Sequence, residues 1–244
     1  MWTAAASTNR VDFLLPLAGR RRDYRQTSLT PLPDPVIYAL AAAGGYLLGS
    51  IPFGVLTTQL AGINIREVGS GNIGATNVLR TGRKDLALIT FVGDTGKGAA
   101  AVGLALLIGH LLRLDLDTRR TLMALAGASA FLGHLYPVWL RFKGGKGVAT
   151  FMGTVFAAAW PMGLLAAGLW LLTAAIFRIS SLSALVAAAL ITPLAFLLDQ
   201  PYPFLGMALF MAVLIYIRHR DNIKRLLKAE EPRIGRKKPA EPQT

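Results

Sequence analysis

Long stretches without charge dominate this chain. Residues 35–65 and 147–177 contain no Asp, Glu, Lys or Arg. Each is longer than the roughly 20 apolar residues that a membrane-spanning helix needs. Leucine, alanine and glycine recur throughout, without the alternation of apolar and polar residues that marks a transmembrane strand. The sequence therefore predicts an all-α integral membrane protein.

Further apolar runs set the number of helices. They cover 121–140, 179–198, 200–217 and 98–112, the last with a shorter stretch at 86–93 before it. The run 147–177 is too long for one straight span, and Pro161 predicts a turn that divides it. The polar residues Asp94 to Gly98 are expected to break the apolar region that contains them. The glycines and proline of Gly49 to Gly54 are expected either to open the helix in the first run or to kink it. We predict seven transmembrane helices, with six as the alternative.

The chain is basic, with 26 Lys+Arg against 13 Asp+Glu. The basic residues collect in short gaps between the apolar runs and in the C-terminal tail, as expected of loops on the inner side of a membrane. No soluble domain remains to bind nucleic acid, so we expect no nucleic-acid partner. With the N-terminus outside, the inner segments are 62–97, 141–146, 178–180 and 218–244.

Five arginines between residues 10 and 25 disagree with this orientation, because it places them on the outer side of the membrane. A tolerated outer tail, a six-span topology or a later start of the chain would each account for them. We expect residues 1–35 to form a disordered N-terminal extension. Residues 36–229 are expected to form the membrane domain, and residues 230–244 a basic C-terminal tail.

A glycine-rich segment at 69–80 is the clearest candidate anion site. Its three glycines allow successive backbone N–H groups to point into one concavity, a geometry suited to phosphate. Arg80 can bind two phosphate oxygens at once. The segment has no carboxylate, which favours an anion site over a plain surface loop. The residues expected to bind phosphate here are Ser70, Gly71, Asn72, Thr76, Asn77 and Arg80.

A second basic loop, Arg141 to Gly147, combines two lysines with three glycines. Anchoring at the membrane surface would explain Lys143 and Lys146 but not the glycines, so we expect a second phosphate site here. Earlier in the chain, Asp94 and Lys97 are spaced to pair along one helix face. Neither segment has the spacing of a nucleotide-binding P-loop, so nucleotide hydrolysis by that motif is excluded.

The side chains offer few nucleophiles. The chain has no cysteine and no serine in a Gly-x-Ser-x-Gly motif. These features suit a pre-activated donor, such as an acyl phosphate that expels phosphate when an alcohol attacks it. Three inner segments rich in glycine and cations, Gly69 to Arg80, Asp94 to Gly98 and Arg141 to Gly147, would then position two phosphate groups and stabilise their charge.

Together these motifs resemble the bacterial acyl-phosphate:glycerol-3-phosphate acyltransferases, the PlsY family. The resemblance covers about residues 36–229. It rests on Gly49 to Pro52, Gly69 to Arg80, Asp94 with Lys97 and Gly98, Gly133 and His134 with Pro137, Lys143 to Thr150, and Arg218 and His219 with Asn222. It implies a seven-helix enzyme of the bacterial inner membrane, with glycine-rich loops and an active site that faces the cytoplasm.

The resemblance also implies a reaction. A fatty acyl group passes from acyl phosphate to the 1-hydroxyl of glycerol 3-phosphate, giving lysophosphatidic acid and phosphate, the first step of phospholipid biosynthesis. No metal or other cofactor is implied, and an enzyme that forms acyl phosphate is implied as a functional link. The glycerol hydroxyl would lose its proton to the departing acyl phosphate or to a nearby polar group such as His219.

Particular residues carry these implied roles. The residues implied to be catalytic are Ser70, Arg80, Lys146 and His219. Asn222 is implied to join them in binding phosphate. A further serine of the family corresponds to Ser181 or Ser183, and Lys97 is an additional candidate.

Three other functions remain open from the sequence. A transporter or scramblase for a phosphorylated metabolite would also combine broken helices with an anion site. A CDP-alcohol phosphotransferase would need a cluster of aspartates for metal ions, whereas the inner loops here are poor in acids. A non-catalytic lipid-binding regulator would tolerate the loss of Arg80 and Lys146.

Overall fold

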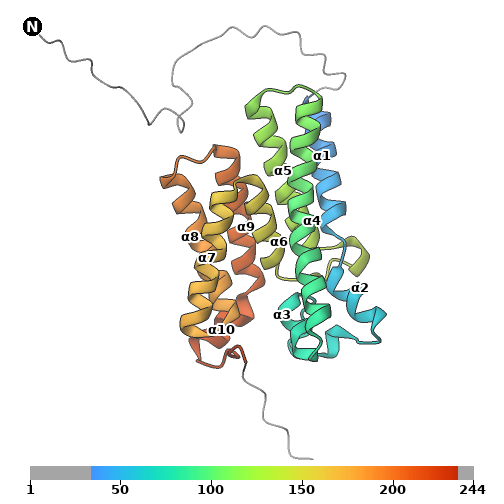
Figure 1. Cartoon of the computed structure of the whole chain (residues 1–244), viewed down its shortest axis with the longest axis vertical. Helices are drawn as coiled ribbons and strands as arrows, with labels where there is room; N and C mark the ends of the chain where they lie inside the picture. Colours follow the sequence, from blue (N-terminus) through green and yellow to red (C-terminus); the bar gives the residue numbers. More distant parts are fainter. Residues whose placement is uncertain (1–33, 236–244) are drawn as a thin grey trace, which may run out of the picture.

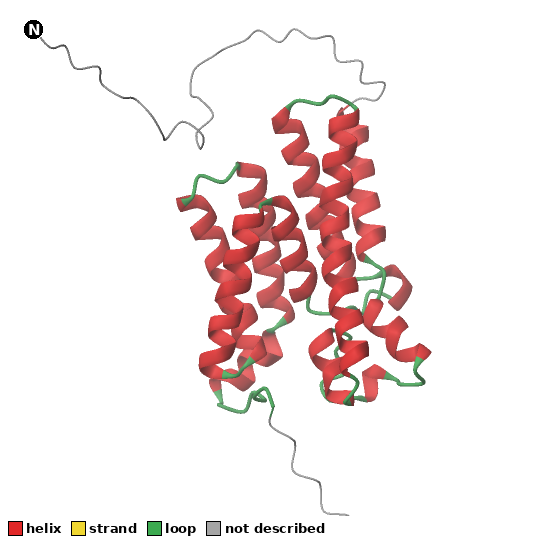
Figure 2. Ribbon diagram, viewed as in Figure 1, coloured by secondary structure: helices red, strands yellow, loops and turns green. Residues whose placement is uncertain are grey.

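The computed structural model describes residues 34–235, which form helices joined by loops (Figure 1, Figure 2). The expected N-terminal extension therefore falls almost entirely outside the described residues, as does the end of the C-terminal tail. The short 3-10 turns are η1 (Ile65–Glu67), η2 (Leu79–Thr81) and η3 (Val138–Leu140). The α-helices are α1 (Asp34–Gly49), α2 (Phe53–Leu60), α3 (Ala75–Val78), α4 (Lys84–Leu111), α5 (Leu116–Leu135), α6 (Val148–Ala158), α7 (Trp160–Phe177), α8 (Ser180–Leu197), α9 (Tyr202–Arg218) and α10 (Arg220–Leu227).

Five helical segments of the described chain are long and apolar enough to cross a membrane. They become six if α9 and α10, which bend by 62° at His219, are counted as one broken span. The prediction of an all-helical membrane architecture is confirmed. The predicted total of seven is not reached by length and composition, because α6 has only 11 residues.

Two of the three predicted helix breaks are present. α1 ends at Gly49 and α2 begins at Phe53, so Pro52 lies in the break between them. The long run 147–177 is divided next to Pro161, which lies in the first turn of α7. In that position proline loses no helical hydrogen bond, since the first N–H groups of a helix have no partner within it.

The prediction of a third break at Asp94 to Gly98 is wrong. α4 continues through this segment as one helix of 28 residues. The two charged side chains lie one turn apart on the same face, and Nζ of Lys97 is 2.8 Å from Oδ1 of Asp94. Each charge therefore has its partner within the helix, so the helix has no need to open.

The helices form two groups, and α4 and α5 of the first group pack against α6 and α9 of the second (Figure 1). One group packs α1, α4 and α5 together. The other group consists of α6 to α9, which together with α5 surround a large apolar core. Its buried side chains include Phe131 of α5 and Phe151, Met162, Ile191 and Met211.

Small residues allow the first group to pack closely. A Cβ atom added at Gly49 would lie 1.9 Å from the carbonyl oxygen of Ala130 in α5. Gly45, one turn earlier, faces the Ala126 backbone in the same way. Such small-residue contacts are typical of helices that associate within a membrane.

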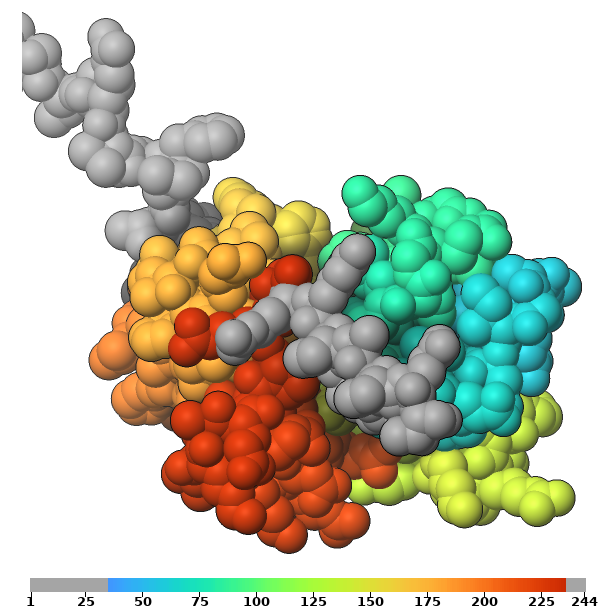
Figure 3. All heavy atoms as spheres, turned by 90° about the horizontal axis from the view of Figure 1, so that it is seen from below, coloured from blue at the N-terminus to red at the C-terminus, as the bar shows by residue number. Residues whose placement is uncertain are grey.

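One end of the molecule gathers segments that are far apart in sequence. α2, α3 and α10 all lie at the lower end in Figure 1. Seen from below, the cyan-green segment of α2 and α3, the yellow-green segment after α5 and the red segment of α10 share this face (Figure 3). The glycine-rich loops and the basic C-terminal residues are therefore placed at a common end.

Candidate active site

Asn77 organises the first glycine-rich loop. Its side chain is buried, and Nδ2 donates hydrogen bonds to the carbonyl oxygens of Ile65 (3.3 Å) and Val68 (2.8 Å). Its Oδ1 accepts from the backbone N–H of Ser70 at 3.0 Å and from the Ser70 hydroxyl at 3.1 Å. Nη1 of Arg80 reaches the same oxygen at 3.4 Å. Asn77 thus holds the loop and sets the positions of Ser70 and Arg80.

Glycine is required where this loop turns. Gly69 and Gly71 have φ angles of +54° and +68°, a region that side chains with a Cβ rarely adopt. The turn leaves the side chains of Ser70, Thr76 and Arg80 exposed at the end of the molecule. The predicted phosphate donors of the loop are therefore accessible, except for the buried Asn77.

The second glycine-rich loop is held from two sides. The backbone N–H groups of Gly144 and Gly145 donate to the carbonyl oxygens of Leu135 (3.0 Å) and His134 (3.1 Å) at the end of α5. The carbonyl oxygens of the same two glycines accept from Nη2 and Nε of Arg218, at 2.9 and 3.1 Å. Both peptide groups are therefore fixed, and the residue that follows them is Lys146.

Lys146 lies in a polar cluster with the start of α8 and the C-terminal segment. Its Nζ donates to Oδ1 of Asn222, and Nδ2 of Asn222 donates to Oε1 of Glu231 at 2.5 Å. The Ser181 hydroxyl donates to the same Oε1 at 2.7 Å, and Nε of Arg225 donates to Oε2 at 2.7 Å. Three donors thus surround the Glu231 carboxylate, with Lys146 linked to it through Asn222, and we call these five residues the Lys146 cluster.

Burial lowers the pKa of Lys146 to about 8. The Glu231 carboxylate opposes this shift, while the positive charges of Arg225, Arg80 and Arg218 add to it. The positive charge of Arg80, in the first glycine-rich loop, therefore acts on Lys146 in the second. Arg66, which precedes the first loop in turn η1, contacts the second loop directly, because its Nη2 donates to the Lys143 carbonyl oxygen at 2.6 Å.

His219 is buried at the bend between α9 and α10. Its Nδ1 lies 2.8 Å from the carbonyl oxygen of Ile215 one turn earlier. In the neutral ring this contact fixes the proton on Nδ1 and leaves the lone pair on Nε2. The ring is therefore arranged so that Nε2 can accept a proton.

The structure separates the two serine candidates. Ser181 belongs to the Lys146 cluster, whereas the Ser183 hydroxyl donates at 3.0 Å to the carbonyl oxygen of Ile179, the residue just before α8. Lys97 is also apart from the cluster, because it forms a buried ion pair with Asp94. Lys143 is exposed at the loop surface.

Three residues of this region were missed by sequence reasoning as site residues. Glu231 and Arg225 belong to the Lys146 cluster, and Arg218 holds the second loop. Glu231 lies in the segment that was assigned to a basic tail. The adjacent glutamates Glu230 and Glu231 within this basic segment were the available signal. Their place in the sequence did not indicate which residues Glu231 would contact.

Comparison with known proteins shows the family of this chain. A family profile described as Glycerol-3-phosphate acyltransferase matches residues 39–229. The protein of that name from Caulobacter vibrioides is 64% identical over 203 residues, which cover 83% of this chain and 90% of the relative. The glycerol-3-phosphate acyltransferase of Rhodospirillum rubrum is 53% identical over 217 residues, which cover 88% of this chain and 99% of the relative.

Two solved structures share the fold. Both are crystal structures of PlsY (YgiH), described as an integral membrane glycerol 3-phosphate acyltransferase. The glycerol 3-phosphate form has a TM-score of 0.73 at 38% identity and covers 81% of this chain and 96% of that chain. The lysophosphatidic acid form has a TM-score of 0.72 at 37% identity, with 81% and 95% covered.

Proposed function

This chain belongs to the glycerol-3-phosphate acyltransferase family, and we propose that it transfers a fatty acyl group from acyl phosphate to the 1-hydroxyl of glycerol 3-phosphate. The products are lysophosphatidic acid and phosphate, the first step of phospholipid biosynthesis. The observation that carries this proposal is that two cationic, glycine-rich loops lie at one end of the helices, where Arg66 beside the first loop donates to Lys143 of the second. The similar PlsY structures, described as glycerol 3-phosphate and lysophosphatidic acid forms, support the acceptor and the product.

Two phosphate sites account for the paired loops. Ser70 and Arg80 hold one phosphate at the exposed first loop, assisted by the backbone of Gly71 and the side chains of Asn72 and Thr76. The Lys146 cluster and His219 hold the other. Each cation stabilises charge on a phosphate, and the fixed backbone of both loops holds the reacting groups close together, which lowers the barrier chiefly through positioning.

Acyl phosphate as the donor fits the chemistry of these residues. The carbonyl carbon of a mixed anhydride is already activated, and phosphate leaves when the alcohol oxygen attacks. The hydroxyl proton passes to the departing phosphate or to Nε2 of His219, whose Nδ1 is held by Ile215. An enzyme that forms acyl phosphate must supply the donor.

The membrane arrangement of this proposal has seven spans. Six of the spans are supplied by α1, α4, α5, α7, α8 and α9. The short helix α6 is the seventh, as a partial span. Its 11 residues extend about 16 Å, so it crosses only part of the bilayer before the chain turns at Ala159. The basic loops then face the cytoplasm of a bacterium across its inner membrane.

The decisive test is phosphate release by the detergent-purified protein. Palmitoyl phosphate and glycerol 3-phosphate are supplied together and separately, with palmitoyl-CoA as a competing donor. Release that needs both substrates and yields lysophosphatidic acid is the expected result. Arg80→Ala serves as the control for contaminating activity and should abolish turnover.

Two outcomes contradict the proposal. Turnover with palmitoyl-CoA in place of palmitoyl phosphate would refute the donor while keeping the family activity. A folded protein without any turnover would refute the reaction, and uptake of glycerol 3-phosphate into liposomes would then support a transporter.

A further inference from the structure

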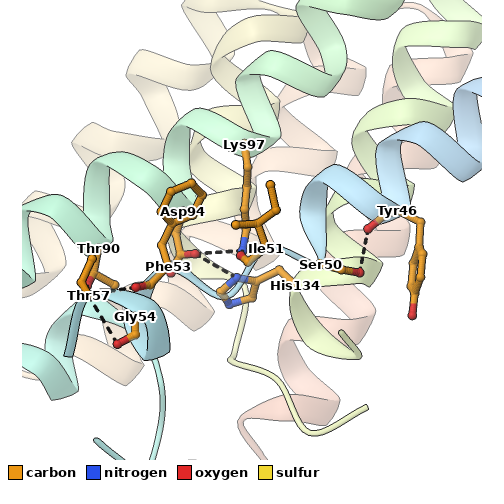
Figure 4. A network of polar contacts seen from close by, with 10 residues as sticks. All are labelled: Tyr46, Ser50, Ile51, Phe53, Gly54, Thr57, Thr90, Asp94, Lys97 and His134. Carbon is orange, nitrogen blue, oxygen red and sulfur yellow. Dashed lines mark hydrogen bonds and ion pairs between the residues drawn. The ribbon is translucent and has the colours of Figure 1, made fainter. Parts of the chain in front are cut away.

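Three ionisable side chains are buried within the helices, away from the loops that bear the predicted donors. Asp94 and Lys97 of α4 form an ion pair at 2.8 Å, with side chains 2% and 1% exposed. Nδ1 of His134, near the end of α5, lies 3.5 Å from Oδ1 of Asp94 (Figure 4). Buried charges in a membrane protein are costly and usually serve a function.

Lys97 ties this group to the break between α1 and α2. Its Nζ donates a hydrogen bond of 2.8 Å to the carbonyl oxygen of Ile51. This carbonyl lies between the two helices, where Pro52 prevents a regular helix from continuing. The lysine therefore fixes the point from which α2 departs, and α2 leads into the first glycine-rich loop.

His134 ties the same group to the second glycine-rich loop. Its carbonyl oxygen accepts the N–H of Gly145, and its ring packs against that residue. A Cβ atom at Gly145 would lie only 2.3 Å from Nε2 of His134. The imidazole and the loop are therefore in direct contact, and Lys146 is the next residue along the chain.

We propose that Asp94, Lys97 and His134 are positioning residues that hold the two phosphate-binding loops at a fixed separation. This inference rests on the proposed function. Within residues 34–235, their side-chain hydrogen bonds and ion pairs are with one another and with the Ile51 carbonyl. They act on the reaction through the backbone that they hold, without touching the groups predicted to bind phosphate.

The consequence for catalysis follows from the geometry. Each loop has its own hydrogen bonds and would still bind its phosphate if the buried group were altered. The distance between the bound donor and the bound acceptor would change, and displacement by about 1 Å can cost about 10²-fold in rate. We therefore expect a loss of kcat with little change in either KM.

Paired substitutions test this without leaving an unpaired buried charge. Asp94→Asn with Lys97→Met removes both charges and the donor to Ile51. Asp94→Asn with Lys97→Gln removes the same charges but keeps an amide N–H that can reach toward Ile51. The first variant should lose about 10²-fold in kcat, and the second should recover part of that loss.

The chain contains a matched control pair. Asp117 and Arg120 of α5 have the same three-residue spacing and lie 3.2 Å apart, but are 90% and 41% exposed. Asp117→Asn with Arg120→Met should leave kcat and both KM values unchanged. A thermal melt of each detergent-purified variant reports whether the fold is retained.

Amide hydrogen exchange gives a readout that does not depend on turnover. Asp94→Asn with Lys97→Met should speed exchange in residues 53–56 and 144–147, while the control pair should leave it unchanged. This comparison remains valid even if the protein does not use acyl phosphate. Failure of the proposed function and failure of the positioning role are therefore distinguishable.

Three results would overturn the positioning role. One is a loss of kcat that merely parallels a loss of folded protein in the thermal melt. Another is a large rise in KM with kcat unchanged, which would make the buried group a support for binding. The third is unchanged exchange in residues 53–56 and 144–147 of the variant.

Discussion

At the scale of single residues, the charge of Lys146 limits the pH range of the reaction. Burial lowers its pKa to about 8 from an ordinary value of 10.5. In the proposed function Lys146 binds phosphate as the protonated ammonium, so kcat/KM should fall as pH rises through this value. Above pH 8 the fall should approach about tenfold per pH unit, because kcat/KM follows the ionisation of the free enzyme.

Folding stability should change in the opposite direction over this range. Between pH 8 and 10.5 the unfolded chain binds the lysine proton and the folded chain does not, so the free energy of unfolding rises with pH. Loss of activity there is therefore not loss of structure.

The variant Lys146→Arg tests this assignment. Its side chain stays charged, so the activity that the variant has at neutral pH should persist above pH 9. If its kcat/KM instead fell above pH 8 as in the unsubstituted protein, the fall would belong to another group.

Substitution of His219 tests whether this side chain acts as the general base. If Nε2 takes the proton from the glycerol hydroxyl, His219→Ala should lower kcat by at least about 10²-fold at neutral pH. An effect confined to KM would instead identify His219 as a binding residue and leave the proton to the departing phosphate. Steady-state kinetics with both substrates varied separates the two roles.

At the scale of elements, the close packing of α4 against α6 can be tested at Gly98. A Cβ atom at Gly98 would lie 2.6 Å from Oγ1 of Thr154 and 2.7 Å from the Thr150 carbonyl oxygen in α6. The backbone oxygen has no freedom to move away, so Gly98→Ala should push α4 and α6 apart. We expect a cost of about 1–3 kcal/mol, as for other overpacked contacts.

A matched glycine lies two residues earlier in the same helix. Gly96 has no atom within 4 Å of an added Cβ. Gly96→Ala should therefore leave the melting temperature in detergent unchanged or slightly raised, while Gly98→Ala lowers it. Equal melting temperatures for the two variants would show that the contact between α4 and α6 is looser than these distances indicate.

Some helix breaks could be predicted from the sequence, and one was predicted wrongly for a physical reason. The breaks near Pro52 and Pro161 were predicted, because proline acts on the backbone locally. The break in α4 was predicted wrongly, because polar residues were taken to end an apolar helix. Their actual partners lie on α4 itself, in the Ile51 carbonyl and on His134, and only the tertiary arrangement brings the last two there.

The same distinction holds for the candidate site. Ser70, Arg80 and Lys146 could be named because glycine-rich basic loops have a recognisable composition. Glu231 could not, because its contacts with Ser181 and Asn222 depend on how the chain turns after α10. No local pattern in the sequence indicates that Ser181 and Glu231, which are 50 residues apart, form a hydrogen bond.

At the scale of the whole molecule, the distribution of charge predicts the orientation in the membrane. The end that carries the candidate site includes Arg66, Arg80, Lys143, Lys146 and the basic residues of α10. The opposite end, between α4 and α5, has Arg113, Arg119 and Arg120 balanced in part by Asp115 and Asp117. The excess of positive charge should keep the first end in the cytoplasm.

Thiol labelling can test this orientation directly, because the chain contains no cysteine. Asp117→Cys and Lys224→Cys each place one thiol at an exposed position, at opposite ends of the helices. In intact spheroplasts a membrane-impermeant maleimide should label only the thiol at position 117. After permeabilisation it should label both, because the thiol at position 224 then becomes accessible. The reverse pattern would place the phosphate-binding loops outside the cell, away from cytoplasmic glycerol 3-phosphate, and would contradict the orientation even if the purified protein were active.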